Sequence, residues 1–264
     1  MYRLLIVTGK QEVQELFASL QGWDALGFKP PRLRDSVEAA LECMRKHHID
    51  AMAIDDAPAF EPLYAYLEEN APNLPIFPIE KTAEDQQRVM RDVSSLLSRL
   101  HADDSNDLYD EDYRMLQQQE RWIRKVLCGL VPTVEEMRKQ MRLYRVRERL
   151  DVPCVLGRLE LPPADDVFLS ERWHYGSERL ETALRNFFGH THDHMVLHVA
   201  VVSPQEVRVL CYPRSEADGL SENAAYDYIQ ETVEQIANYL GLELKVTEVC
   251  RVSGLAAFAA QDKA

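Results

Sequence analysis

The chain has 264 residues, of which 46% are hydrophobic and 28% are charged, and its formal net charge is −14 at pH 7. This length accommodates one or two domains with a core each, and the net negative charge disfavours binding to nucleic acid, which needs clustered Lys and Arg. No apolar run approaches the roughly 20 residues of a membrane span, and no signal peptide is visible. Five scattered Cys without a CxxC motif indicate reduced thiols. We therefore expect a cytoplasmic protein that does not contact a membrane.

The first hundred residues alternate strand and helix signals. Apolar runs at residues 4–7, 51–54 and 74–79 predict buried strands, and the amphipathic stretches between them predict helices. Ser36 and Thr82 precede two of these stretches and are typical N-cap residues. Alternating strands and helices of this size indicate a parallel sheet with right-handed crossovers.

Residues 101–112 are polar and acidic, which indicates a domain boundary. From position 109 to position 144, apolar residues recur in steps of three and four, with Glu120 as a polar exception. This is the spacing of a coiled-coil seam. Two interpretations follow: a dimerising helix over roughly 109–128, or separate helices that pack on their own domains.

A second helix is expected after the break at Pro132, because Thr133 and Glu136 have the spacing of a capping box. Its continuation, residues 138–149, is locally basic. This segment suits either contact with an acidic partner or nucleic acid, or, more simply, a helix face exposed to solvent.

The segment from Pro153 onward predicts the element order β-α-β-β-α-β, with a hairpin turn at residues 203–206. Ser221 and Gly241 stand where the second helix would begin and end. This order is that of an α+β domain of the ferredoxin-like type.

The first hundred residues resemble the receiver domain of two-component response regulators, which has a flavodoxin-like parallel sheet. The stretch IDAMAIDD is similar to the family's phosphoacceptor strand. The resemblance implies that Asp55 occupies the phosphoacceptor position, with Asp56 beside it as a supporting residue.

Several positions depart from the receiver pattern. Thr8 and Gly9 stand where the family has the acids that hold Mg²⁺, and Glu80 stands where it has a hydroxyl. Lys81 is the available stand-in for the family's lysine. Phosphotransfer to a carboxylate needs a cation to neutralise the reacting oxygens. We therefore predict that Asp55 is not phosphorylated productively.

The second half resembles the middle domain of AraC-type response regulators, a degenerate relative of the GGDEF nucleotidyl cyclases. The stretch Val126–Leu130 is similar to the leading helix of that domain, and the element order agrees. Active cyclases carry Gly-Gly-Asp/Glu-Glu-Phe at the central hairpin, where this chain has Ser203-Pro-Gln-Glu206. The resemblance therefore implies a domain without cyclase activity.

One cluster has residue types that bind metals: His190, His192 and His194, in GHTHDHMVLH. It is one residue short of the HxHxDH motif of metallo-β-lactamase-like hydrolases. Alternating His in an extended segment project to one side, so two could share a metal. A polar loop between a helix and a strand is the simpler interpretation, and we expect neither a metal nor a cofactor.

These observations predict three parts: a receiver-like domain at 1–102, an acidic linker with connector helices at 103–150, and a degenerate cyclase-like domain at 151–264. The function expected is that of a non-catalytic regulator that works through a protein partner and forms a homodimer through the connector helix. The alternatives are the sensor portion of a longer AraC-type DNA-binding regulator, a divergent nucleotidyl cyclase, or a metal-dependent hydrolase.

Overall fold

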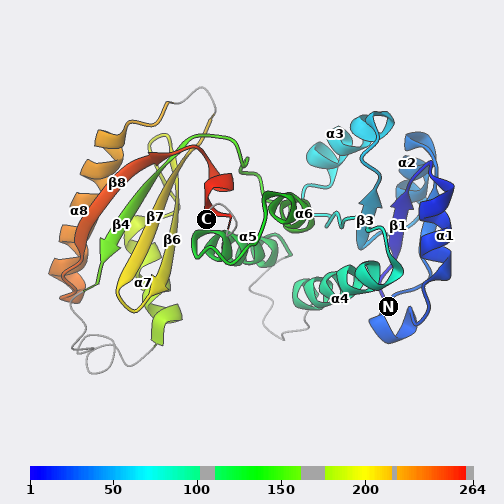
Figure 1. The fold of residues 1–264 in the computed structure, drawn as a ribbon, viewed down its shortest axis with the longest axis horizontal. Helices are drawn as coiled ribbons and strands as arrows, with labels where there is room; N and C mark the ends of the chain where they lie inside the picture. Colours follow the sequence, from blue (N-terminus) through cyan, green and yellow to red (C-terminus); the bar gives the residue numbers. More distant parts are fainter. Residues whose placement is uncertain (102–110, 162–175, 216–218, 260–264) are drawn as a thin grey trace. The chain divides into compact units, whose positions relative to one another are not determined.

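The structure is a computed structural model that describes residues 1–101, 111–161, 176–215 and 219–259. It divides into two compact units: unit 1 comprises residues 1–119 and 138–147, and unit 2 comprises residues 120–137 and 148–264. The connector helices, α5 (Glu111–Leu127) and α6 (Val134–Tyr144), therefore belong partly to each unit (Figure 1). None of the helices described in these ranges is long and apolar enough to cross a bilayer.

Unit 1 is built on a parallel sheet in the strand order β2-β1-β3, formed by β1 (Leu4–Val7), β2 (Arg32–Arg34) and β3 (Ala51–Ile54). The strand predicted at 74–79 is reduced to one parallel bridge, between Met52 and Ile76. Proline at positions 75 and 78 supplies no N–H, so the ladder cannot extend along this segment.

Helices cover both faces of this sheet (Figure 1), and every residue of β1 and β3 is therefore buried. One face packs against α1 (Gln11–Ser19) and α4 (Ala83–Leu100), and the other packs against α2 (Val37–Lys46) and α3 (Glu61–Asn70). The predicted caps are confirmed: the Ser36 side chain accepts from the amide of Ala39, and the Thr82 side chain accepts from the amide of Asp85. Two short 3₁₀ helices complete the unit, at Asp24–Leu26 and Pro58–Phe60.

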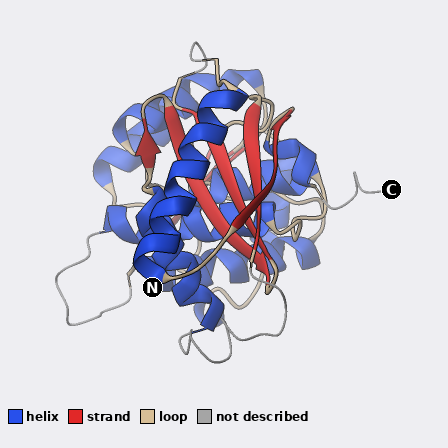
Figure 2. Ribbon diagram, turned by 90° about the vertical axis from the view of Figure 1, so that its left-hand side faces the viewer, coloured by secondary structure: helices blue, strands red, loops and turns tan. Residues whose placement is uncertain are grey.

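Unit 2 contains a separate antiparallel sheet in the order β5-β6-β7-β4-β8 (Figures 1 and 2). Its strands are β4 (Cys154–Glu160), β5 (Thr191–His192), β6 (Met195–Ser203), β7 (Glu206–Pro213) and β8 (Lys245–Val252). The predicted hairpin is confirmed, since β6 and β7 pair from Met195 opposite Pro213 to Ser203 opposite Glu206.

Two helices, α7 (Gly176–Phe188) and α8 (Glu222–Leu240), pack on one face of this sheet. The Ser221 cap is confirmed, and Gly241 ends α8 with a left-handed backbone at φ 65°. The alternate strand residues, among them Leu156, Arg158 and Arg208, point to the opposite face. A 3₁₀ helix at Leu255–Phe258 follows β8.

The apolar side chains of α5 differ in how far the chain itself buries them. Trp122, Ile123, Val126 and Leu127 are each at most 2% exposed within the chain itself, whereas Leu116 is 45% exposed. Of the other seam positions, residue 109 and the side chain of residue 113 lie outside the described part. The C-terminal half of α5 therefore packs within its own chain, which favours the interpretation of separate packed helices for that half. Dimerisation itself stays a prediction.

The polar exception in the seam has a partner within unit 2. Arg185 of α7 donates to Glu120 Oε2 at 2.6 Å and to Glu181 Oε1 at 3.0 Å. Glu181 also accepts from the backbone amide of Val201, on the part of β6 that β5 does not pair, and from Arg124 at 3.0 Å. These ion pairs fix the C-terminal half of α5 against α7 and the edge of the sheet.

Candidate functional site

The carboxyl ends of parallel strands meet at one edge of a sheet, and here that edge brings together residues from β1 and β3. The Asp55 amide donates to the Val7 carbonyl at 2.9 Å, so the ladder continues one residue past β3. Thr8 follows β1 directly and is fully buried, and its hydroxyl donates to Asp55 Oδ2 at 3.2 Å. Asp55, the predicted phosphoacceptor position, therefore lies at the centre of this edge.

A lysine forms a hydrogen bond with the other carboxylate oxygen of Asp55. Lys10 Nζ donates to Asp55 Oδ1 at 2.8 Å, and the Asp55 side chain is only 8% exposed. The hydrogen bond from the ammonium to Asp55 and the charge of that carboxylate raise the pKa of Lys10 above its ordinary value. A protonated amine thus pairs with Asp55 at neutral pH. It supplies a charge of one, with no open coordination position for a phosphoryl oxygen.

Two further acids at this edge are paired with basic residues of α6 that belong to the same unit. Arg142 donates to Asp56, and Lys139 Nζ donates to Glu80 Oε1 at 2.6 Å. The Arg142 guanidinium also lies 5.4 Å from the centre of the Tyr64 ring, in a cation–π contact. Its backbone carbonyl accepts from the Ile76 amide at 3.4 Å, beside the shortened strand.

These contacts give two residues of the basic segment at 138–149 acidic partners within unit 1. Lys139 pairs with Glu80, and Arg142 pairs with Asp56 while its side chain stays 50% exposed. Arg145 likewise donates to the Pro72 carbonyl at 2.9 Å. The segment borders the shortened strand, where the Ile76 amide donates to the Arg142 carbonyl.

The structure places the predicted site residues unevenly. Asp55 and Asp56 are at the edge, whereas Lys81 is exposed in the loop before α4, with no described contact to Asp55. Sequence reasoning missed Lys10, whose Nζ donates to Asp55 Oδ1. The available signal was its place two residues after Thr8, in the loop that follows β1.

The histidines do not converge. His190 Nδ1 lies 3.5 Å from Glu120 Oε1, and the His192 ring stacks on Tyr228 with a centroid distance of 3.9 Å. His194 follows the turn at Asp193, which has φ 48°. Within the described ranges, no group of three or more His, Cys, Asp or Glu side chains is arranged to hold a metal ion.

Comparison with protein-family models finds no match to this chain, and comparison with curated proteins finds none either.

Proposed function

We propose that the protein is a non-catalytic signalling or transcription-regulatory protein of the cytoplasm. In this proposal unit 1 is a pseudo-receiver, a receiver-like domain that has lost its phosphorylation chemistry, and unit 2 is a degenerate cyclase-like domain. The protein acts through contacts with a protein partner. The observation that carries the proposal is the ion pair between Lys10 and Asp55.

The chemistry of this pair argues against phosphotransfer. An aspartyl phosphate carries about two negative charges where the carboxylate carried one, and a bound divalent cation would balance them. Lys10 contributes one positive charge, and Thr8 contributes a hydroxyl that donates to Asp55. The two further acids at this edge, Asp56 and Glu80, are engaged by Arg142 and Lys139.

The fold supports the resemblance at the level of topology. Unit 1 has a parallel sheet whose central strand is β1, with helices on both faces, which agrees with a flavodoxin-like arrangement shortened at one edge. In unit 2 the elements β4, α7, β6, β7, α8 and β8 follow the β-α-β-β-α-β order of ferredoxin-like domains.

The hairpin of unit 2 supports a non-catalytic assignment. Its turn contains Pro204, and the one acid there, Glu206, accepts from Arg208 Nε at 2.7 Å. Two metal ions need several acidic oxygens that are free to coordinate them, as in two-metal enzymes.

The contacts of α6 indicate how the edge could influence the rest of the chain. The ion pairs of Asp56 and Glu80 hold the part of α6 that belongs to unit 1, and the same helix begins in unit 2. A partner that displaced Arg142 from Asp56 would release this end of α6.

The proposal is tested in two steps. The protein is first incubated with acetyl phosphate or beryllofluoride and Mg²⁺, and intact mass and melting temperature are measured. We expect no adduct and no shift; a stoichiometric adduct that Asp55→Asn abolishes would refute the pseudo-receiver assignment. The protein is then purified from its native host, and mass spectrometry should identify a partner whose retention Arg142→Ala weakens.

A further inference from the structure

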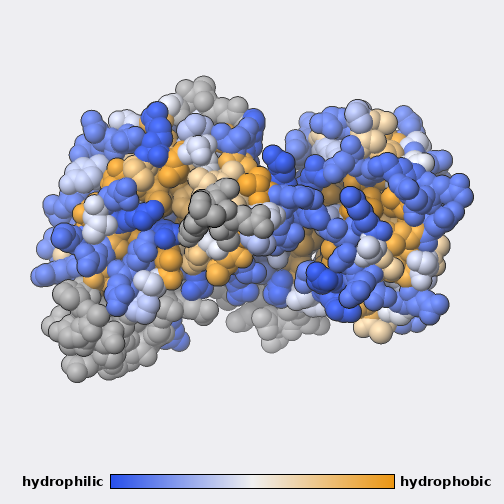
Figure 3. All heavy atoms as spheres, viewed as in Figure 1, coloured by the Kyte–Doolittle hydropathy of each residue, from blue (hydrophilic) through white to orange (hydrophobic). Residues whose placement is uncertain are grey.

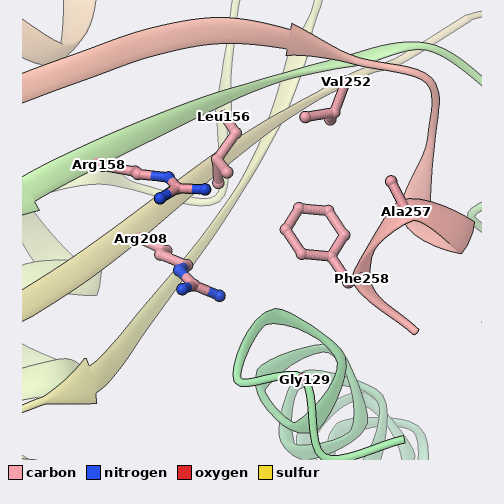
Figure 4. Close-up of a pocket in the computed structure, with 7 residues that line it drawn as sticks. All are labelled: Gly129, Leu156, Arg158, Arg208, Val252, Ala257 and Phe258. Atoms are coloured by element: carbon pink, nitrogen blue, oxygen red, sulfur yellow. The ribbon is translucent and has the colours of Figure 1, made fainter. Parts of the chain in front are cut away.

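A cavity lies on the face of the unit 2 sheet opposite α7 and α8. Its volume is about 250 Å³, and the described residues that line it all belong to unit 2 (Figure 4). Two of its walls differ in chemistry: one carries two guanidinium groups and the other is apolar. The lining residues are Gly129, Leu156, Arg158, Arg208, Val252, Ala257 and Phe258.

The cationic wall is formed by two arginines that are direct cross-strand partners. Arg158 of β4 pairs with Arg208 of β7 in the ladder, and both guanidinium groups extend toward the cavity (Figure 4). Like charges placed directly opposite each other in a sheet are destabilising. A pair in this position therefore calls for negative groups to balance it.

The chain supplies part of that balance. Arg158 Nε lies 3.3 Å from Glu248 Oε2, and Arg208 Nε donates to Glu206 at 2.7 Å. Arg208 also donates to the carbonyl of Leu127, at the end of α5. Among the described residues, no contact engages the terminal Nη atoms of Arg158, whose side chain is 45% exposed. This fork is available to bind a planar anion.

The apolar wall is positioned by the backbone around Gly254. Gly254 has φ 143°, and a Cβ at this position would lie 2.3 Å from the Leu150 carbonyl oxygen. The next turn is fixed by the Ala256 amide, which donates to the same carbonyl at 3.1 Å. This arrangement places the Phe258 ring opposite Leu156 and the arginines (Figure 4).

We propose that this cavity binds a small organic carboxylate with an apolar body. The carboxylate would sit on the Arg158 fork beside Arg208, and the apolar body would pack on Phe258, Leu156 and Val252. Each arginine already forms an ion pair with one glutamate, so a ligand with one negative charge fits the site better than a ligand with two. The volume lies just below the range of roughly 300–1,000 Å³ for drug-sized ligands, which indicates a smaller molecule. This inference does not depend on the proposal for unit 1.

Benzoate is a suitable probe, because it joins one carboxylate to one ring. Calorimetric titration of the full chain at pH 7.5 should show saturable binding with one site and a millimolar dissociation constant, as expected for so small a ligand. Benzamide, its neutral counterpart, should bind at least tenfold more weakly. Phenyl phosphate should bind no more tightly than benzoate.

Arg158→Gln should weaken benzoate binding about tenfold, and Arg158→Lys should recover only part of it because an ammonium lacks the planar fork. The matched control is Arg214→Gln, an exposed arginine of unit 2 outside the cavity, which should bind like the wild type. Circular dichroism and melting temperature establish that each variant is folded. If Arg158→Gln does not fold, Phe258→Leu provides the second test, with an expected loss of several-fold.

Three results would overturn the proposal: no saturable benzoate binding by the wild type, equal binding of benzoate and benzamide, or unchanged affinity in folded Arg158→Gln. Tighter binding of phenyl phosphate would overturn its restriction to a single negative charge.

Discussion

Lys10 and Asp55 are 45 positions apart in the chain, yet Lys10 Nζ donates to Asp55 Oδ1 at 2.8 Å. Each follows the end of a strand, β1 or β3, and these strands are parallel neighbours whose register places Val7 opposite Ile54. The pairing of the strands therefore brings an ammonium to Asp55, the predicted phosphoacceptor position.

Removing the ammonium should destabilise unit 1. In Lys10→Met the Asp55 carboxylate, 8% exposed, keeps Thr8 as a donor but loses its counter-charge, and burying an unbalanced charge is unfavourable. We expect a lower melting temperature for Lys10→Met, and partial recovery in the double variant Lys10→Met/Asp55→Asn. The control is Lys81→Met, which changes an exposed lysine. A Lys10→Met protein as stable as the wild type would show that the pair contributes nothing.

Local chemistry predicted much of the fold, because the signals lie within a few residues of each other. Ser36, Thr82 and Ser221 cap the helices that they precede, and Gly241 ends α8 with a positive φ. These positions depend on the backbone groups next to them. The prediction failed at 74–79, where an apolar run indicated a strand but proline limits pairing to one bridge.

The site was harder to predict than the elements, because its contacts join distant segments. Arg142 and Asp56 are separated by 86 positions, and Lys139 and Glu80 by 59. A periodic pattern shows that α6 has an apolar face but does not show which acids its basic residues meet. The same limit applies to Glu120, which looked like a defect in a seam and is the partner of Arg185.

Because α5 has both buried and exposed apolar residues, its role in folding can be tested separately from its role in dimerisation. Ile123 is 2% exposed and Leu116 is 45% exposed. We expect Ile123→Asp to destabilise the chain by several kcal/mol, on the order of 4, because it buries a charge in an apolar site. Leu116→Asp should stay within about 0.5 kcal/mol of the wild type in urea unfolding.

Sedimentation analysis then tests the dimer with folded protein. The wild type should sediment as a dimer at tens of micromolar, roughly the middle of the affinity range, and Leu116→Asp should sediment as a monomer. A monomeric wild type at that concentration would contradict dimerisation, and a fully dimeric Leu116→Asp would place the interface elsewhere.

Glu181 should be among the most sensitive positions of unit 2. Its side chain is 7% exposed and accepts from the Val201 amide and two arginines. Glu181→Ala leaves that amide and both guanidinium groups without this acceptor, and breaking a buried pair in this way costs about 3–5 kcal/mol. The matched control is Glu222→Ala, whose side chain is 48% exposed. Similar unfolding free energies for the two variants would contradict the role assigned to Glu181.

Two buried thiols should make stability decline in alkaline solution. Burial raises the pKa of Cys154 and of Cys211 from 9.0 to about 12. Both groups stay protonated in the folded chain while the unfolded chain loses these protons above pH 9. Their contribution is therefore complete below pH 9 and is lost as the pH rises toward 12, at up to about 1.4 kcal/mol per pH unit for each thiol.

Urea unfolding between pH 8 and pH 11 measures this slope. Because Tyr and Lys also titrate there, the decisive quantity is the difference between the wild type and Cys154→Ala, which should lose stability less steeply with pH. Parallel slopes for the two proteins would show that the Cys154 thiol ionises equally in both states.

Gly254 should be far less replaceable than Gly241, although both have positive φ. At Gly241, φ is 65° and a Cβ would meet no atom within 4 Å, so Gly241→Ala should cost only about 1 kcal/mol for the left-handed cap. At Gly254, φ is 143° and the Cβ would lie 2.3 Å from the Leu150 carbonyl oxygen. The backbone must therefore shift, and Gly254→Ala should cost at least about 2–3 kcal/mol.

The shift at Gly254 should also reach the cavity, because the 3₁₀ helix at Leu255–Phe258 begins at the next residue. A folded Gly254→Ala protein should bind benzoate more weakly than the wild type, while Gly241→Ala should bind it normally. Urea unfolding gives the two stability losses, and titration of the same samples gives the two affinities. Equal losses of stability in Gly254→Ala and Gly241→Ala would mean that the backbone around Leu150 moves to accommodate the added methyl group. Normal benzoate binding by Gly254→Ala would mean that Phe258 keeps its place without the geometry that this glycine provides.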